Sequence, residues 1–305
     1  MSHKFAATIG VFDGVHRGHR FLIERLKTEA RQRGLGTMVI TFARHPRQVL
    51  CPDWRPQLLT TPGEKEVLLR QTGVDRVVML PFDQQMAQLS ARQFMEQVLH
   101  KQLGVLLLLT GYDNHFGHRS ERAAGAEGFA DYVAYGRELG MEVVGGQPLR
   151  EGDVCFSSSL VRRLVSEGDV TAAAHCLGRP YELSGQVVHG EQIGRELGFP
   201  TANLQPADDC KLLPLAGVYA VWVSIGGSCE KKLRGMMNIG HRPTFDGHRT
   251  TLEVHILDYS SNLYGQDISV AFVRRLRDER HFDTREALVA QMGKDRQQVE
   301  QIFSN

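Results

Sequence analysis

Short apolar runs alternate with longer amphipathic segments in the first half of the chain. The segments carry apolar residues at helical spacing, and the runs cover residues 6–10, 37–42, 76–80, 105–110 and 142–145. Strands that are apolar throughout are buried on both faces, as in a parallel sheet covered by helices. The alternation therefore predicts an α/β domain with a parallel sheet.

The helices of this half carry start signals in the sequence. Thr61 is followed by Pro62 and, three positions on, by Glu64, which predicts a capped helix that runs to about Gly73. A further helical stretch begins at three consecutive serines and covers residues 157–177. We expect both helices to cover the parallel sheet or to follow it directly.

The helical pattern stops at residues 178–180, where the sequence Gly-Arg-Pro breaks a helix. Alternating strand patterns with Gly, Pro, Asp and Ser turns follow at residues 181–188, 217–225, 251–257 and 268–273. They predict a small antiparallel β-barrel, covered by a last helix over residues 284–303 with Asp283 as its cap. We place the domain boundary at the break, which gives domains of residues 1–180 and 181–305.

Composition excludes several classes of protein. Apolar residues make up 42% and charged residues 23%, which is ordinary for a globular protein and excludes a disordered or fibrous chain. With 36 basic and 35 acidic residues, no global field attracts nucleic acid or a membrane surface. The longest apolar run, residues 105–109, is far shorter than the roughly 20 residues of a membrane span.

The start of the chain and its cysteines indicate a compartment. Residues 1–5 lead directly into a strand pattern without a secretory leader, so we expect a cytoplasmic protein. Five cysteines are widely spaced and contain no C-x-x-C pair, which favours reduced core thiols over a disulfide or zinc framework. We expect no nucleic-acid or membrane partner, and homo-oligomerisation stays open.

The strongest chemical signal is the turn of residues 10–19, which follows the first strand. Gly10 and Gly14 allow a tight turn, Gly18 allows the backbone to approach a phosphate, and His16 and His19 lie at the start of the next helix. Helix N-termini bind anions, and histidines donate to phosphate oxygens as charge develops on a leaving group. For either histidine alone, an ordinary surface residue is the better interpretation, but the whole pattern indicates nucleotidyl transfer.

A second constellation combines three serines with Arg162, one helical turn further on. Hydroxyl groups at residues 157–159 cap a helix, and an arginine in its first turn can hold a triphosphate through two hydrogen bonds. A serine-rich cap beside a solvated arginine explains the same residues equally well. A third group, His115 and His118 near Asp113, lacks a third histidine at zinc spacing, so we favour a phosphate-facing loop there.

These motifs resemble, in order, the bacterial bifunctional riboflavin kinase/FAD synthetase family. The first half of the resemblance rests on residues 10–19, on Gly111-x-Asp113-x-x-Phe116-Gly117 and on Ser157-Ser158-Ser159-x-Val161-Arg162. The second half rests on residues 194–203, on Gly217-Val218-Tyr219, on residues 237–245 and on Glu253-Val254-His255. The resemblance covers nearly the whole chain.

The resemblance implies a Rossmann-like nucleotidyltransferase domain followed by an antiparallel β-barrel riboflavin kinase domain with a C-terminal helix. The barrel would phosphorylate riboflavin with ATP to give FMN, and the first domain would adenylylate FMN with a second ATP to give FAD and pyrophosphate. Mg²⁺ would assist both steps. Riboflavin, FMN and ATP are then the expected partners, and FMN and FAD are substrate or product.

The resemblance also assigns residues to roles. The catalytic residues would be Glu253, as base for the ribityl hydroxyl, together with His16 and His19. ATP and phosphate in the first domain would contact Gly10, Phe12, Asp13, Gly14, Gly18, Asp113, Ser158, Ser159 and Arg162. ATP and flavin in the barrel would contact Gly190, Gly194, Arg195, Gly198, Phe199, Pro200, Tyr219 and Asn238. Thr201 and Asn203 would hold Mg²⁺ through neutral oxygens.

Two alternatives stay open at this stage. One is a single-activity nucleotidyltransferase of the H-x-G-H superfamily with a passive flavin-binding barrel, and the other is a flavin sensor without turnover. Asn114 and Arg44 depart from the residues that the family commonly has beside the first site. An assay with riboflavin, ATP and Mg²⁺ separates these possibilities.

Overall fold

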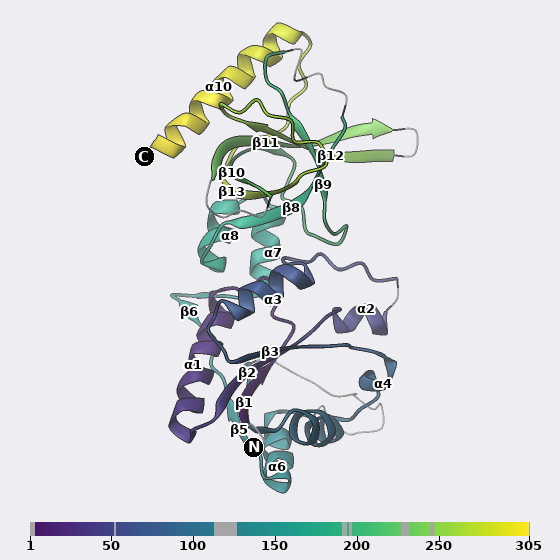
Figure 1. The fold of residues 1–305 in the computed structure, drawn as a ribbon, viewed down its shortest axis with the longest axis vertical. Coiled ribbons are helices and arrows are strands. Elements are labelled where there is room, and N and C mark those ends of the chain that lie inside the picture. Colours follow the sequence, from purple (N-terminus) through teal and green to yellow (C-terminus); the bar gives the residue numbers. More distant parts are fainter. Residues whose placement is uncertain are drawn as a thin grey trace. The chain divides into compact units, whose positions relative to one another are not determined.

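A computed structural model describes residues 4–51, 53–112, 127–190, 194, 197–226, 232–244 and 247–304. The chain divides into two compact units, Met1–Ser158 and Ser159–Asn305. Each unit has its own sheet and its own buried core, and we describe each by itself (Figure 1).

The first unit contains a five-stranded parallel sheet in the order β3-β2-β1-β4-β5. Its strands are β1 (Phe5–Ile9), β2 (Gly36–Phe42), β3 (Arg76–Leu80), β4 (Val105–Thr110) and β5 (Glu142–Gly145). All five predicted strands are therefore confirmed. The order changes direction at β1, and the carboxyl end of β1 leads into the turn of residues 10–19. Ligands of open parallel sheets bind at such a position.

Helices cover both faces of this sheet, because its strands are apolar on both faces. They are α1 (Arg17–Arg33), α2 (Pro46–Leu50), α3 (Pro62–Arg70), α4 (Gln84–Ala87), α5 (Ala91–Phe94), the π-helix η1 (Met95–Gln102) and α6 (Phe129–Leu139). On one face Ala7 packs in a core with Met95 of η1 and Tyr132 of α6. On the other face Ala6 packs in a core with Leu26 of α1 and Leu69 of α3. A short hairpin of β6 (Arg150–Glu151) and β7 (Val154–Cys155) precedes the unit boundary.

The second unit is a closed antiparallel barrel in the order β10-β11-β12-β9-β8-β13, as predicted. Its strands are β8 (Tyr181–Val188), β9 (Ala202–Pro206), β10 (Gly217–Ile225), β11 (Leu233–Thr244), β12 (Gly247–Ile256) and β13 (Asp267–Arg277). Helix α10 (Arg285–Ser304) packs against β11 and buries Val299 among Val218, Ala220 and Met236 (Figure 1). The expected covering helix is thereby confirmed.

Two details of the helices differ from the sequence prediction. The stretch 157–177 is not one helix, because Gly168 adopts a positive φ of 80° between α7 (Ser158–Ser166) and α8 (Val170–Leu177). The cap of α10 is Thr284 and not Asp283, since the Thr284 hydroxyl accepts a hydrogen bond from the amide of Ala287 at 3.2 Å. The Thr61 capping box of α3 is present as predicted.

Four cysteines lie in the described part of the chain, and none of these four forms a disulfide bond. Only Cys176 is buried, so the expectation of core thiols is wrong for Cys51, Cys155 and Cys210. None of the helices within the described ranges is long and apolar enough to cross a membrane.

Candidate active sites

The turn after β1 has a strained backbone. Phe12 and Val15 have positive φ angles of 52° and 40°, and Gly14, between them, has a φ of 82°. Non-glycine residues rarely adopt such angles, and strained positions persist only where the surrounding structure fixes them. The turn therefore has a conformation that its neighbours must hold in place.

The two histidines of the turn form a stacked pair at the start of α1. Their ring centroids lie 3.6 Å apart, and Nδ1 of His16 accepts a hydrogen bond from the amide of His19 at 3.3 Å. Because Nδ1 is the acceptor, the neutral His16 ring carries its proton on Nε2. A Cβ atom on Gly18 would lie 2.9 Å from the carbonyl oxygen of Phe156 and 3.0 Å from the His16 ring, so only glycine fits there.

Asp13 faces the interior of the first unit. It is only 3% exposed, and its carboxylate accepts hydrogen bonds from the amides of Leu59 and Thr60, each at 3.0 Å, and from the Thr60 hydroxyl. The same hydroxyl accepts from the amide of Gly14. The carboxylate thus anchors the turn to residues 59–60, although the sequence suggested that Asp13 contacts ATP.

The other predicted residues of this site have different surroundings. Phe12 is buried with its ring edge-on to His19, at 5.0 Å between centroids, and a Cβ atom on Gly10 would lie 3.2 Å from the Phe12 ring. The hydroxyl of Ser158 donates to the Asp13 carbonyl at 2.9 Å, so the first predicted serine does reach the turn. Ser159, which is exposed, and Arg162, which is half-buried, follow on α7.

Several residues of the sequence prediction lie outside the described residues. Among them are Asp113, with its neighbours Asn114, His115 and His118, and Arg195 of the barrel.

The barrel brings three predicted polar residues into one row. Glu253 of β12 pairs with Asn238 of β11 on one side and with Asn203 of β9 on the other. Directly paired residues of antiparallel strands project from the same face of the sheet. The predicted base, one predicted metal ligand and one predicted ligand-binding residue therefore lie side by side across three strands.

Two glycines approach the predicted metal ligands closely. A Cβ atom on Gly190 would lie 2.1 Å from the Asn203 amide, and one on Gly194 would lie 3.1 Å from the Thr201 hydroxyl. The oxygens of Thr201 and Asn203 are neutral, hard donors, which suit a Mg²⁺ that takes its other ligands from water and phosphates. Within the described ranges no group of three His, Cys, Asp or Glu side chains is arranged to hold a metal ion.

A cavity of about 300 Å³ opens beside this row. Thr201, Asn238 and Glu253 line one part of it. The remaining wall combines polar side chains, among them Thr251, His255, Glu279 and Arg280, with apolar ones. The apolar side chains are Leu197, Val218, Met236, Phe282, Leu288 and Met292. The charged pair of Arg277 and Asp295 also lines it, with Nη2 and Oδ2 2.8 Å apart.

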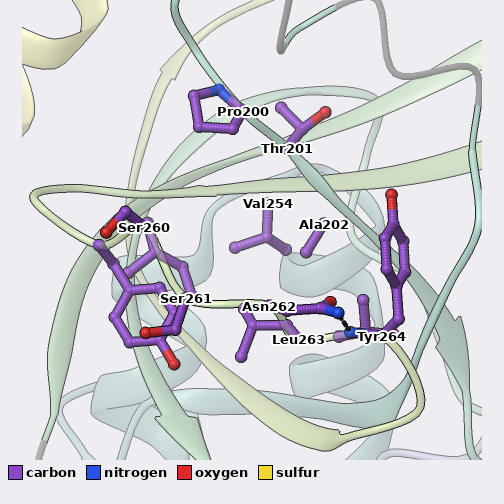
Figure 2. Close-up of a pocket in the computed structure, with 12 residues that line it drawn as sticks. Pro200, Thr201, Ala202, Val254, Ser260, Ser261, Asn262, Leu263 and Tyr264 are labelled. Atoms are coloured by element: carbon purple, nitrogen blue, oxygen red, sulfur yellow. Dashed lines mark hydrogen bonds between the residues drawn. The ribbon is translucent and has the colours of Figure 1, made fainter.

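Thr201 also lines a second cavity, of about 420 Å³. Figure 2 shows how Pro200, Thr201 and Ala202 lie across from the loop of residues 259–264, with Val254 between them. The ring of Tyr264 in this loop stacks on His189 at 3.9 Å between centroids. Thr201 is thus shared by two cavities, each of a size that accepts part of a small ligand.

His255 is a site residue to which sequence reasoning assigned no role. It is 6% exposed and lies two positions after Glu253 on β12, and its Nδ1 is 2.9 Å from the carbonyl oxygen of Pro200. A carbonyl only accepts, so Nδ1 donates. Burial lowers the pKa of His255, which keeps the ring neutral, and its buried Nε2 has no partner among the described residues. The signal available in the sequence was its position on the face of Glu253.

The remaining predicted barrel residues differ in their contacts with His255 and with the two cavities. Phe199 is half-buried with its ring edge-on to His255, at 5.4 Å between centroids, and Pro200 lines the larger cavity. Gly198 has a φ of 79° in the turn before them. Tyr219 is fully buried, donates its hydroxyl proton to the Leu215 carbonyl and does not line either cavity, so its predicted ligand contact stays a prediction.

Comparisons with known proteins match both halves of the chain. A family model described as FAD synthetase matches residues 1–160, and one described as riboflavin kinase matches residues 177–303. A bifunctional riboflavin kinase/FMN adenylyltransferase of Escherichia coli is 41% identical over 97% of this chain and 92% of its own length. An enzyme of the same name from Pseudomonas fluorescens is 38% identical over 95% of this chain and 90% of its own.

A solved structure from Streptococcus pneumoniae has the same fold over 98% of this chain and 95% of its own. Its TM-score is 0.88 and its identity is 31%. Its title names a macrolide-efflux protein, whereas both family models and these sequence relatives name flavin enzymes over the same residues. The chain belongs to the bifunctional riboflavin kinase/FMN adenylyltransferase family.

Proposed function

We propose that the chain phosphorylates riboflavin to FMN in its barrel and adenylylates FMN to FAD in its first unit, with ATP as the donor in both steps. The observation that carries this proposal is the row of Asn238, Glu253 and Asn203 beside Thr201. A passive flavin-binding barrel would need neither a base nor oxygen ligands for a metal beside its cavity.

The two cavities of the barrel fit the two substrates of a kinase. Glu253 lines only the smaller cavity, so the hydroxyl that it activates belongs there, and the apolar side chains of that cavity suit the flavin ring. The larger cavity then receives the nucleotide. Its phosphates would lie at Thr201, which both cavities share. This arrangement brings the γ-phosphoryl group to the ribityl hydroxyl.

Each residue of the kinase site has one task in this proposal. Glu253 accepts the proton of the ribityl 5′-hydroxyl while the hydroxyl oxygen attacks the γ-phosphorus and ADP leaves. Asn238 lies beside Glu253 to orient that hydroxyl. Thr201 and Asn203 would hold Mg²⁺, which neutralises charge on the phosphates when it is bound. His255 holds the Pro200 carbonyl and so fixes the residue that precedes Thr201.

The first unit would use its turn in the second step. The positive end of α1 favours the phosphates of ATP, and the Nε2 proton of His16 can donate to a phosphate oxygen. The FMN phosphate attacks the α-phosphorus, and pyrophosphate leaves. We propose that His16 and His19 stabilise the negative charge that develops during this step.

The cysteine thiols and the proposed substrates indicate the cellular compartment in which the chain works. The four described cysteines, among them the exposed Cys51, form no disulfide bond, which suits a reducing compartment, and we propose the cytoplasm. The substrates are small molecules, and no part of the proposed reaction needs a nucleic acid or a membrane.

One assay tests the proposal directly. The purified chain is incubated with riboflavin, ATP and Mg²⁺, and the flavins are separated by chromatography over time. FMN should appear first and FAD afterwards, and both should be absent when a chelator removes Mg²⁺. Formation of FMN without FAD would refute the role of the first unit. Formation of neither product would refute the role of the barrel, and a second reaction with supplied FMN and ATP then tests the first unit.

A further inference from the structure

Lys65 on α3 is a buried cation in the first unit that the proposed reaction does not use. It is 7% exposed, and its Nζ donates to the carbonyl of Phe42 at 2.8 Å and to the carbonyl of Val11 at 3.1 Å. Phe42 ends β2, and Val11 directly precedes the strained Phe12. One ammonium group therefore joins the end of a neighbouring strand to the beginning of the turn.

The Val11 carbonyl accepts a second hydrogen bond from the hydroxyl of Thr41, at 3.0 Å. On the far side of Phe12, Asp13 is tied to residues 59–60, which lie just ahead of α3. The strained part of the turn is consequently fixed on both sides by one continuous segment, residues 59–65. Such fixation is what positions with unfavourable backbone angles require.

Lys65 also brings a positive charge to the turn, in addition to its two hydrogen bonds. Asp13 places a buried carboxylate inside a turn that is proposed to bind phosphate, and an uncompensated negative charge there would repel the ligand. Burial lowers the pKa of Lys65 to about 8, and the carboxylate of Asp13 acts in the opposite direction. A neutral donor would make the same two hydrogen bonds without the cost of burying a cation, so the positive charge needs a reason.

We propose that Lys65 is a positioning residue for adenylyl transfer, which holds the turn of residues 10–19 in place and neutralises Asp13 beneath the phosphate site. This inference rests on the proposed role of the turn in FAD synthesis. It adds a residue that touches neither ATP nor FMN but sets the local charge that ATP meets. We therefore expect a substitution that removes the charge of Lys65 to change the KM for ATP in FAD synthesis without reducing the amount of folded protein.

Two substitutions separate the charge from the hydrogen bonds. Lys65→Gln keeps two N–H donors and removes the charge, whereas Lys65→Arg keeps the charge. We expect Lys65→Gln to raise the KM for ATP in FAD synthesis about 10-fold, the size of coupling found between residues of one buried network. Lys65→Arg should stay within about 3-fold of the wild-type KM, which corresponds to the lower end of that coupling range. A wild-type KM in Lys65→Gln would overturn the proposed neutralisation.

A double variant tests whether Asp13 is the group that is neutralised. In an Asp13→Asn background the carboxylate charge is gone, so adding Lys65→Gln should change the KM for ATP by less than about 3-fold. An unchanged 10-fold effect in that background would show that Lys65 does not act through Asp13. That result would overturn the proposal as well.

Two controls keep these outcomes interpretable. Lys27 on α1 also donates to a backbone carbonyl, that of Thr72, at 2.9 Å, but it lies outside the turn network, and Lys27→Gln should leave the KM for ATP unchanged. Riboflavin phosphorylation by the same chain reports on the second unit in every variant. Failure of the wild-type chain to make FAD from FMN would refute the proposed function itself, which is a different result from any of those above.

Discussion

Among single residues, Glu253 carries most of the proposed kinase chemistry. Replacing it by glutamine keeps the size of the side chain and removes the proton acceptor. A general base typically contributes a factor of about 10² to 10⁴ in rate, so Glu253→Gln should lower the kcat of riboflavin phosphorylation by that amount. Conversion of supplied FMN to FAD should not change. Chromatography of the flavins measures both steps, and a variant with normal phosphorylation would remove Glu253 from the site.

Substitutions of His255 can separate the roles of its two ring nitrogens, Nδ1 and Nε2. Asparagine places an amide N–H near the position of Nδ1, glutamine places one near Nε2, and leucine has neither. Because Nδ1 donates to the Pro200 carbonyl, we expect His255→Asn to retain more kinase activity than His255→Gln or His255→Leu. A lost buried hydrogen bond of about 1–3 kcal/mol corresponds to roughly 5- to 150-fold.

The readout for His255 should include binding as well as rate. Displacement of Thr201 would weaken the Mg²⁺-dependent binding of ADP, which calorimetry measures without turnover. Equal activity and equal nucleotide affinity in all three variants would show that the Pro200 contact is dispensable.

At the residue scale the sequence singled out residues of the proposed kinase site but not the buried residues that hold the two proposed sites in place. Glu253, Thr201 and Asn203 stand in motifs whose order and spacing resemble a known family. Lys65 looks in the sequence like an ordinary polar residue of a capped helix. Its burial depends on carbonyl groups 23 and 54 positions away, and no local pattern contains that information.

Among the elements, α10 is tied to the barrel by a buried ion pair. Arg277 of β13 and Asp295 of α10 are joined through Nε and Nη2, and their side chains are 13% and 2% exposed. Asp295→Leu leaves a buried guanidinium without its partner, which typically costs about 3–5 kcal/mol of unfolding free energy. The double variant with Arg277→Met should recover most of that loss.

The fluorescence of Trp222 can follow this helix, since its ring lies 4.1 Å from that of Phe303 near the end of α10. The other tryptophan, Trp54, is replaced by phenylalanine, and urea unfolding is measured. Arg296→Met is the matched control, because its more exposed ion pairs should contribute less than about 1 kcal/mol. A similar loss in Arg296→Met and Asp295→Leu would contradict the special role of the buried pair.

The helices and strands with a simple periodic pattern could be predicted from the sequence. Strands interrupted by polar residues and prolines, and a helix break that depends on one glycine, could not. The strands of the parallel sheet are continuous apolar runs and were located within one residue. Strands β9 and β11 contain Asn203, Asn238 and two prolines, which interrupt the strand pattern, so both were missed. The break between α7 and α8 depends on the positive φ of Gly168, which an isolated glycine in a helical sequence does not reveal.

For the whole molecule, the two units have independent cores and separate candidate sites. The first compact unit ends at Ser158, whereas the sequence pattern puts the boundary at residue 180. Residues 159–180 contain α7 and α8, and their assignment to one activity stays a prediction. Along the chain, the proposed adenylylation site comes before the proposed phosphorylation site, which is the reverse of the proposed order of the two reactions. FMN made by the second unit is then the substrate of the first.

The central claim is that one chain carries two separable activities, and mixing two inactive variants tests it most directly. Glu253→Gln should form FAD from riboflavin about 10²- to 10⁴-fold more slowly than the wild-type chain, and His19→Ala should accumulate FMN in solution. A mixture of the two purified variants should form FAD from riboflavin, because FMN released by one chain serves the intact first unit of the other. Formation of FAD by either variant alone as fast as by the mixture, or a mixture that makes FMN but no FAD, would contradict the account.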